Sequence, residues 1–206
     1  MNQENINRFL YSIYNDVSPS AVSIECRKKY GLYDDNCLVY GESHLPSLYD
    51  IFNEVAPKTG EIFYDWGSGS GRVVLYAALN FPFAKCKGIE LLDDLVDVAQ
   101  TKLELFKKEL PNLSDFDPNK SGEIEFIQAD FTKVAVSDAD VIYMASTCFD
   151  EKLMSSLAAL LEKQLRSGAR VITATKSLPS EQFKITKSQL FPMEWGQVTV
   201  FFHEKI

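Results

Sequence analysis

Three glycines at alternate positions follow an acidic residue in the segment Phe63–Gly71, which reads FYDWGSGSG. The acidic residue, Asp65, ends a stretch whose alternating pattern predicts a strand. Glycine lets a backbone approach a ligand closely, and a carboxylate can meet a cationic group. A turn that only reverses the chain does not require three alternate glycines. The segment therefore predicts a ligand-binding loop made by Asp65, Gly67, Ser68, Gly69 and Gly71.

The spacing of these glycines indicates the class of ligand. Dinucleotide-binding folds use G-x-G-x-x-G to place a pyrophosphate at a helix N-terminus, whereas here the third glycine comes one residue early. This argues against a nicotinamide-dependent oxidoreductase. A D-x-G-x-G-x-G loop suits a nucleoside with an amino-acid tail and a positive charge. We therefore expect S-adenosyl-L-methionine, which carries an ammonium and a sulfonium and no phosphate, as the cofactor.

Two further strand ends carry residues that fit a nucleoside. Glu90, followed by Leu91, ends the predicted strand after the glycine loop, where a carboxylate can accept both ribose hydroxyls. Asp130 and Phe131 follow the next predicted strand, where the acid can accept from the adenine amino group and the ring can cover the base. The alternative for Asp130 and Phe131 is a polar loop start and a core aromatic side chain.

Strands alternate with helices along the chain, which requires a mostly parallel sheet with ligands at the carboxyl ends of its strands. We expect an α/β fold: a seven-stranded, mostly parallel sheet with helices on both faces, a Rossmann-like methyltransferase whose last strand is antiparallel. Residues 1–37 are expected to form a helical N-terminal cap and residues 38–206 the S-adenosylmethionine-binding methyltransferase domain. A solvent loop is expected at 111–122. The expected strands are 61–65, 84–90, 124–128, 140–144, 170–174, 183–190 and 197–203, and the expected helices after the cap are 45–55, 72–80, 94–110 and 151–166.

Composition and charge narrow the function further. The formal charge of −8 repels phosphate backbones, and no basic run exceeds Arg27-Lys28-Lys29, so we expect no direct contact with nucleic acid. The four cysteines and two histidines lie apart without ligand spacing, so no metal site is predicted. No signal peptide or apolar span is visible, and we expect no membrane contact and an intracellular, cytoplasmic protein, or a nuclear one in a eukaryote.

The segment Val39–Ser43, followed by a helix and then by the glycine loop, resembles the disruptor-of-telomeric-silencing family, the non-SET histone-lysine methyltransferases. The similarity runs from about Leu38 to the C-terminus and includes Val171–Lys176 and the closing Trp195-Gly196-x-Val198. The resemblance implies a protein-lysine N-methyltransferase acting on a protein with an accessible lysine. It also implies a loop that closes over the cofactor, with Tyr40, Glu42 and Ser43 at its methionine end.

The sequence departs from the family at two places near the acceptor. Where the family has N-N-F-x-F, this chain has Ala145-Ser146-Thr147-Cys148-Phe149, and Val200 stands where the family has a tyrosine. We place Ala145 in the cofactor site and expect Ser146, Phe149 and Trp195 to be catalytic. Phe149 and Trp195 would form the wall of the acceptor channel, with Ser146 and Thr147 as polar contacts. These departures leave two alternatives open: a cofactor-binding regulatory module without turnover, and a methyltransferase of a small molecule.

Overall fold

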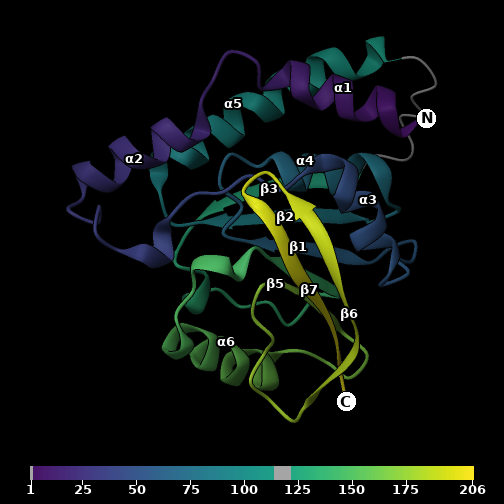
Figure 1. Ribbon diagram of the computed structural model, residues 1–206. Coiled ribbons are helices and arrows are strands. Elements are labelled where there is room, and N and C mark those ends of the chain that lie inside the picture. Colours follow the sequence, from purple (N-terminus) through teal and green to yellow (C-terminus); the bar gives the residue numbers. More distant parts are fainter. Residues whose placement is uncertain (1, 114–121) are drawn as a thin grey trace.

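The computed structural model describes residues 2–113 and 122–206 as one seven-stranded sheet with helices on both faces (Figure 1). The strand order is β3-β2-β1-β4-β5-β7-β6. Strands β1 to β5 are parallel, while β7 runs antiparallel to both β5 and β6. The strands are β1 (Ile62–Trp66), β2 (Lys85–Glu90), β3 (Glu123–Gln128), β4 (Val141–Met144), β5 (Arg170–Ala174), β6 (Phe183–Met193) and β7 (Gly196–Lys205). The predicted fold class is confirmed.

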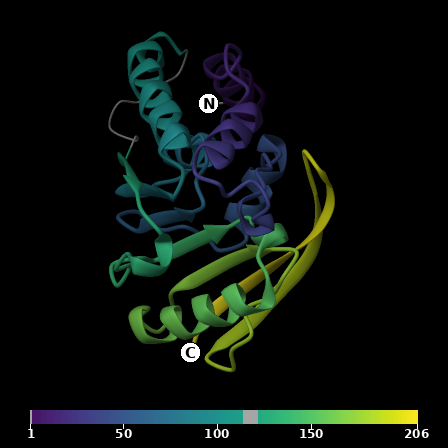
Figure 2. The same cartoon turned by 90° about the vertical axis from the view of Figure 1, so that its left-hand side faces the viewer.

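Helices cover the two faces unequally. One face and its core lie under α1 (Gln3–Ile13), α3 (Leu45–Asn53), α4 (Arg72–Asn80) and α5 (Asp93–Glu109). The other face packs against α6 (Glu151–Gln164) and the segment after β3. Figure 2 shows the sheet between these layers, with α6 on the side opposite α1 and α5. Most of the predicted loop 111–122 falls on residues 114–121, which lie outside the described residues.

The two N-terminal helices are held by different contacts, α1 by its buried apolar side chains and α2 by ion pairs with α5. In α1, Ile6, Leu10 and Ile13 are buried in the same core as α3 and α4. Helix α2 (Pro19–Lys29) packs against α5, and its Lys29 ammonium lies 3.2 Å from Asp93 and 3.0 Å from Asp94. The boundary predicted between residues 37 and 38 stays a prediction, although these contacts join the segment before it closely to the sheet.

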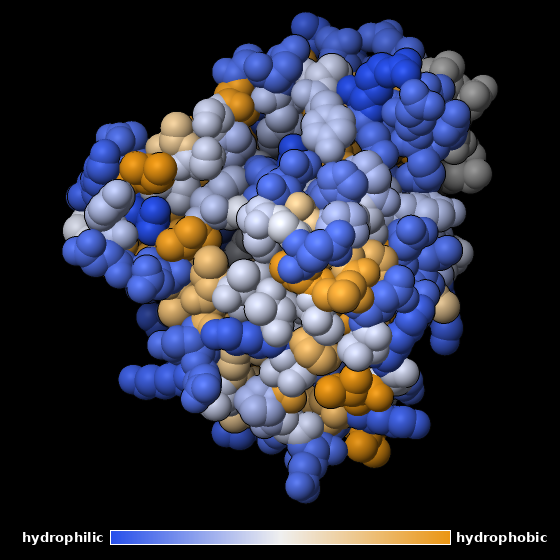
Figure 3. Space-filling view, in the orientation of Figure 1, coloured by the Kyte–Doolittle hydropathy of each residue, from blue (hydrophilic) through white to orange (hydrophobic). Residues whose placement is uncertain are grey.

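The last two strands form a long hairpin whose outer edge is exposed. Seven consecutive residues of β6, Lys184 to Leu190, are solvent-exposed, and lysines on an edge strand discourage pairing with another chain. In Figure 3 the visible face is mostly polar, with the apolar side chains in separate groups and one such group over this hairpin. Among the described residues, no helix combines the length and the apolar character that crossing a bilayer requires.

Pairing between β1 and β2 fixes where the glycine loop begins. The two strands are in register, with Asp65 opposite Gly88 and Trp66 opposite Ile89. The amides of Gly67 and Ser68 then donate to the Ile89 carbonyl at 2.9 and 3.0 Å. Because parallel strands end at the same edge of the sheet, the loop after β1 and the end of β2 lie side by side.

Gly71, the third glycine of the loop, is required by packing. Its φ is +83°, a left-handed conformation, and it caps the N-terminus of α4. A Cβ there would lie 2.4 Å from the Phe126 ring and 2.9 Å from Ala99. The one-residue difference from a dinucleotide loop thus places glycine where α4 meets β3 and α5.

Replacing Gly71 by alanine should therefore destabilise the fold more than the same change at Gly168, which has φ +82° and nothing within 4 Å of an added Cβ. We expect Gly168→Ala to lower the free energy of unfolding by about 1 kcal/mol, the cost of the left-handed backbone. Gly71→Ala should cost roughly 3 kcal/mol or more, because overpacking adds to that strain. Urea unfolding followed by circular dichroism measures both, and equal costs would contradict the packing role.

Candidate functional site

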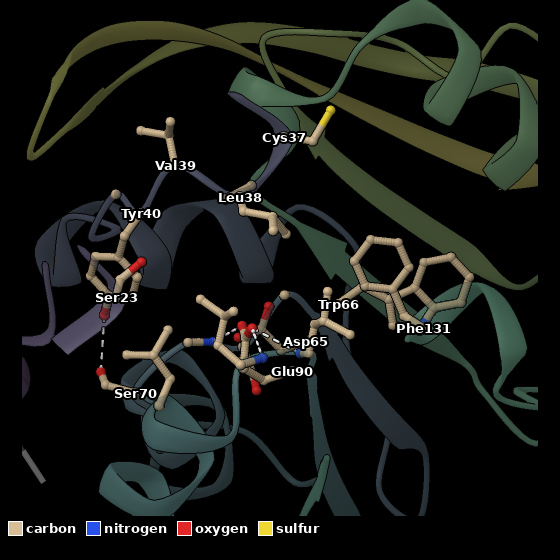
Figure 4. Close-up of a pocket in the computed structure, with 18 of the residues that line it drawn as sticks. Ser23, Cys37, Leu38, Val39, Tyr40, Asp65, Trp66, Ser70, Glu90 and Phe131 are labelled. Atoms are coloured by element: carbon tan, nitrogen blue, oxygen red, sulfur yellow. Dashed lines mark hydrogen bonds between the residues drawn. The ribbon is translucent and has the colours of Figure 1, made fainter. Parts of the chain in front are cut away.

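A cavity of about 300 Å³ opens at the carboxyl ends of β1, β2 and β4 (Figure 4). This volume is at the lower end of the range for small-molecule sites. Segments that are distant in the sequence form it: the glycine loop, the segment before α3, the end of β2, and the turns after β3 and β4. The cavity is lined by twelve of the thirteen residues predicted to bind the cofactor: Tyr40, Glu42, Ser43, Asp65, Gly67, Ser68, Gly69, Glu90, Leu91, Asp130, Phe131 and Ala145. Gly71 is the exception.

Asp65 is a buried carboxyl group that pairs with no cation among the described residues. The residue is 3% exposed, and the hydrogen bonds of the described residues include none to its carboxylate. Burial raises its pKa well above the ordinary value, and the nearby Glu90 and Glu42 raise it further. A cationic group bound in the cavity would stabilise the ionised form of Asp65.

Glu90 is held by three backbone amides. Its Oε1 accepts from Leu91 and Leu92 at 2.8 and 2.9 Å, and its Oε2 accepts from Gly69 at 2.9 Å. Burial raises its pKa, while these hydrogen bonds oppose that rise. The carboxylate therefore joins the glycine loop to the end of β2, and its remaining lone pairs can accept ligand hydroxyls.

The loop containing Tyr40, Glu42 and Ser43 closes over the glycine loop. The Tyr40 ring lies against Gly69, where an added Cβ would be 2.5 Å from Cε2. Its hydroxyl contacts the Glu42 carboxylate and donates to Ser70 Oγ at 3.1 Å. The Ser43 hydroxyl is 2.9 Å from the Tyr143 hydroxyl. These bonds set the loop as the roof of the cavity.

Arg72 places a positive charge beside the cavity, and the sequence pattern did not predict it. Its side chain is 10% exposed, and its guanidinium lies 2.6 Å from the Glu42 carboxylate and donates to the Ser43 carbonyl at 3.2 Å. The Tyr11 ring of α1 stacks over it at 5.5 Å. Its position in the sequence, directly after the glycine loop, could have indicated that it lies at the site. A guanidinium beside the cavity can bind a ligand carboxylate.

Aromatic rings form a second wall of the cavity. Trp66 and Phe131 are stacked with centroids 5.4 Å apart and planes within 1° of parallel, and Phe149 lies 5.7 Å from Phe131. Trp66 was also missed, although it stands between Asp65 and Gly67. Asp130 uses Oδ1 to accept from the Thr132 amide at 2.9 Å and hydroxyl at 2.6 Å. Flat apolar surfaces of this kind suit a nucleobase.

Of the three residues predicted to be catalytic, only Phe149 lines the cavity. Ser146 is fully buried, and its hydroxyl donates to the Ala174 carbonyl at 2.7 Å. Trp195 lies outside the lining and packs on Gly41, where an added Cβ would be 2.9 Å from Cε3. The Thr147 hydroxyl, predicted as a polar contact, is 2.8 Å from that of Thr175. Ser146 and Trp195 thus support neighbouring segments.

The histidines and most cysteines lie away from the cavity. His203 is buried, accepts from the Leu178 amide at 3.1 Å and lies 3.0 Å from the Val171 carbonyl. Cys26 approaches Asp93 and Asp94 closely enough for a shared ligand. However, the Lys29 ammonium already binds both of those carboxylates.

Comparison with protein families gives one match that covers most of the chain. The family described as "Histone methylation protein DOT1" matches residues 17–194. Curated proteins named histone-lysine N-methyltransferase, H3 lysine-79 specific, are also similar. That of Caenorhabditis elegans is 34% identical over 155 residues, covering 71% of this chain and 16% of the relative. That of Aspergillus fumigatus is 28% identical over 178 residues, covering 85% of this chain and 34% of the relative. This chain therefore spans about a third or less of these relatives.

Solved structures show the same fold at low sequence identity. An RNA methyltransferase from Salinibacter ruber in complex with S-adenosyl-L-homocysteine superposes with a TM-score of 0.60 and 22% identity, covering 78% of this chain and 90% of that one. A SAM-dependent methyltransferase from Methanosarcina mazei gives a TM-score of 0.60 with 15% identity, covering 77% of this chain and 98% of that one. These likenesses establish the architecture.

Replacing Asp65 by asparagine should weaken binding of a cationic nucleoside and stabilise the free protein. Loss of one charge-assisted contact corresponds to roughly 1.5–3 kcal/mol, or about ten- to a hundredfold in affinity for S-adenosylhomocysteine. Because folding raises the pKa of Asp65, stability falls as the pH rises from the ordinary carboxyl value toward the raised one, and the amide removes that loss. Calorimetry measures the change in affinity, and thermal unfolding measures the change in stability.

Asp138→Asn is the control, since Asp138 pairs with Lys87 outside the cavity lining. Binding unchanged in Asp65→Asn would refute the assignment.

Binding should also release a proton. The raised pKa keeps Asp65 protonated to a higher pH in the free protein, and a bound cation favours the ionised form. The affinity for S-adenosylhomocysteine should thus rise with pH until Asp65 is ionised in the free protein. Titrations in buffers of different ionisation enthalpy measure the proton count. We expect release from the wild-type protein and a smaller release from Asp65→Asn, and equal release from both would argue against this titration.

Proposed function

The chain belongs to the histone methylation protein DOT1 family, and from that premise we propose that it transfers a methyl group from S-adenosylmethionine to a lysine side chain of a protein. The observation that carries the proposal is the buried Asp65 at the end of β1, beside Glu90 and under the Tyr40 loop. The family assignment supports the methyltransferase class and the cofactor that the sequence predicted.

The residues of the cavity fit this cofactor by chemical type. Asp65 matches its ammonium group, Arg72 its carboxylate and Glu90 its ribose hydroxyls, while Trp66 and Phe131 offer an apolar wall for the base. When bound, S-adenosylmethionine supplies an electrophilic methyl group on a sulfonium. Transfer to a lysine nitrogen forms one C–N bond, breaks one C–S bond and releases one proton from the nitrogen.

The chain's own contribution to this reaction is positioning and exclusion of water. An in-line displacement needs alignment more than it needs a general base. The hydrogen bonds of Glu90 and the contacts of Tyr40 with Glu42 and Ser70 hold the floor and the roof in fixed positions. An amine that enters a desolvated site loses its proton more readily, because burial disfavours the charged form. The wall that includes Phe149 contributes to that desolvation.

For the substrate, the relatives point to histone H3. They are named as H3 lysine-79-specific enzymes, and we infer a protein lysine of that class for this chain. The cytoplasmic location expected from the sequence is not supported, because histone-modifying relatives suggest a nuclear role in a eukaryote. The negative net charge repels the phosphate backbone of DNA, so we expect this chain not to bind DNA by itself.

A second candidate, cofactor binding without turnover, is favoured by the acceptor side. Val200, at the position of the family tyrosine, is fully buried in the core. Ser146 is occupied by its bond to Ala174. Neither residue offers a polar group to an incoming lysine, so binding and catalysis must be tested separately.

Incubation with methyl-labelled S-adenosylmethionine and either core histones or reconstituted nucleosomes tests the proposal. We expect label on histone H3, located by mass spectrometry, and loss of at least about nine-tenths of it in Asp65→Asn, consistent with the lost cofactor contact. Asp138→Asn should retain activity. Label appearing only on small molecules in a host extract would overturn the protein substrate. Thermal stabilisation by S-adenosylhomocysteine with no acceptor labelled would favour the second candidate.

A further inference from the structure

Two free cysteines lie on neighbouring turns at the edge of the cavity. Cys37 belongs to η1 (Asn36–Leu38), the turn that leads into the Tyr40 loop, and it lines the cavity. Cys148 belongs to η4 (Ser146–Cys148), the turn after β4. The two turns pack against each other, with Cα atoms of facing residues within 8 Å. Figure 4 shows the Cys37 sulfur directed away from Asp65 and Glu90.

These two thiols are also the accessible ones. Cys37 and Cys148 are partly exposed, whereas Cys26 and Cys86 are fully buried. Burial raises the pKa of Cys26 to about 11 and raises that of Cys86 as well, so both are poor nucleophiles. We therefore expect an oxidant to react with Cys37 and Cys148 before it reacts with the two buried cysteines.

Cys148 lies among groups that change its pKa in opposite directions. Burial raises the pKa of Cys148, and a negative charge on Cys37 raises it further, while Lys176 and Arg27 lower it. The two cations partly offset the effect of burial on the thiolate that must form during oxidation.

We propose that Cys37 and Cys148 form a reversible disulfide that ties η1 to η4 and closes the cavity edge against cofactor exchange. Such a bond needs Cα atoms about 4.4–6.8 Å apart, and the two turns that carry these cysteines already pack against each other. The turns precede Tyr40 and follow Ala145, so one bond would restrain both the roof and the acceptor side.

The chemistry balances with hydrogen peroxide as the oxidant. The Cys37 thiolate attacks one peroxide oxygen, the O–O bond breaks, and a sulfenic acid and hydroxide result. The Cys148 thiolate then attacks that sulfur, the S–O bond breaks, and the disulfide and a second hydroxide form. The two protons that the thiols release on ionisation convert both hydroxides to water. Two electrons pass from the sulfurs to the peroxide. A dithiol reductant restores the two thiols by thiol–disulfide exchange and is itself oxidised to a disulfide.

This proposal concerns the cavity described above and rests on the proposed function only for the identity of the cofactor. The bond itself is detected without any activity measurement. Treating the full chain with hydrogen peroxide, blocking free thiols and digesting with trypsin should yield peptide 30–58 joined to peptide 134–152. The Cys148→Ser variant cannot form this product, and its fold is checked by circular dichroism.

The second measurement is the rate of cofactor association. Stopped-flow tryptophan fluorescence follows S-adenosylhomocysteine binding, because Trp66 lines the cavity. We expect association to slow on the order of tenfold after oxidation, as a restrained lid slows exchange, and to recover on reduction. Cys148→Ser should show the same rate before and after peroxide treatment.

Three results would overturn the proposal. One is oxidation of Cys37 or Cys148 to sulfenic or sulfinic acid without the joined peptide. Another is the joined peptide with an unchanged association rate, and the third is equal slowing in Cys148→Ser. If the reduced protein fails to bind S-adenosylhomocysteine but the joined peptide forms, the function proposed above fails and the disulfide stands without a role in cofactor exchange.

Discussion

The cavity depends on a group of acidic side chains that outnumbers the cations beside it. Glu90, Asp65 and Glu42 all line it, and one guanidinium, that of Arg72, lies among them. Burying a carboxylate costs free energy unless hydrogen bonds or an opposite charge compensate it. Glu90 has three amide donors and Glu42 has Arg72. Asp65 has neither in the part of the chain that the structure describes, so burial raises its pKa and a bound cation would stabilise its ionised form.

The rest of the fold keeps these charges in place. Parallel pairing of β1 with β2 brings Asp65 and Glu90 to one edge of the sheet, and the glycine loop fits between them. The roof is fixed from the opposite end of the sequence: the Glu194 amide donates to the Glu42 carbonyl at 3.3 Å, and Trp195 covers Gly41. The N-terminal helix adds the Tyr11 ring over Arg72. The cavity is therefore a product of tertiary packing as much as of the glycine loop.

Sequence reasoning predicted the parts that depend on local pattern. The strands, the helices between them and the positions of Asp65 and Glu90 follow from periodicity and from where each strand ends, and the parallel sheet then brings these two residues together. Arg72 and Trp66 were missed because their burial depends on neighbours from α1 and the turn after β3. Ser146 was assigned to the acceptor side, yet its rotamer points to the Ala174 carbonyl. Side-chain direction of this kind is decided by packing that no local pattern encodes.

The glycine loop shows how one motif can serve two purposes. Gly69 donates its amide to Glu90 and leaves room for the Tyr40 ring, so it acts on the cavity. Gly71, two residues later, leaves room for Phe126 and Ala99 and acts on the attachment of α4 to the sheet. Of these two glycines, only Gly69 lines the cavity. The spacing of the glycines sets where the following helix begins. The start of that helix decides which backbone groups face the ligand, so the spacing differs between cofactor classes.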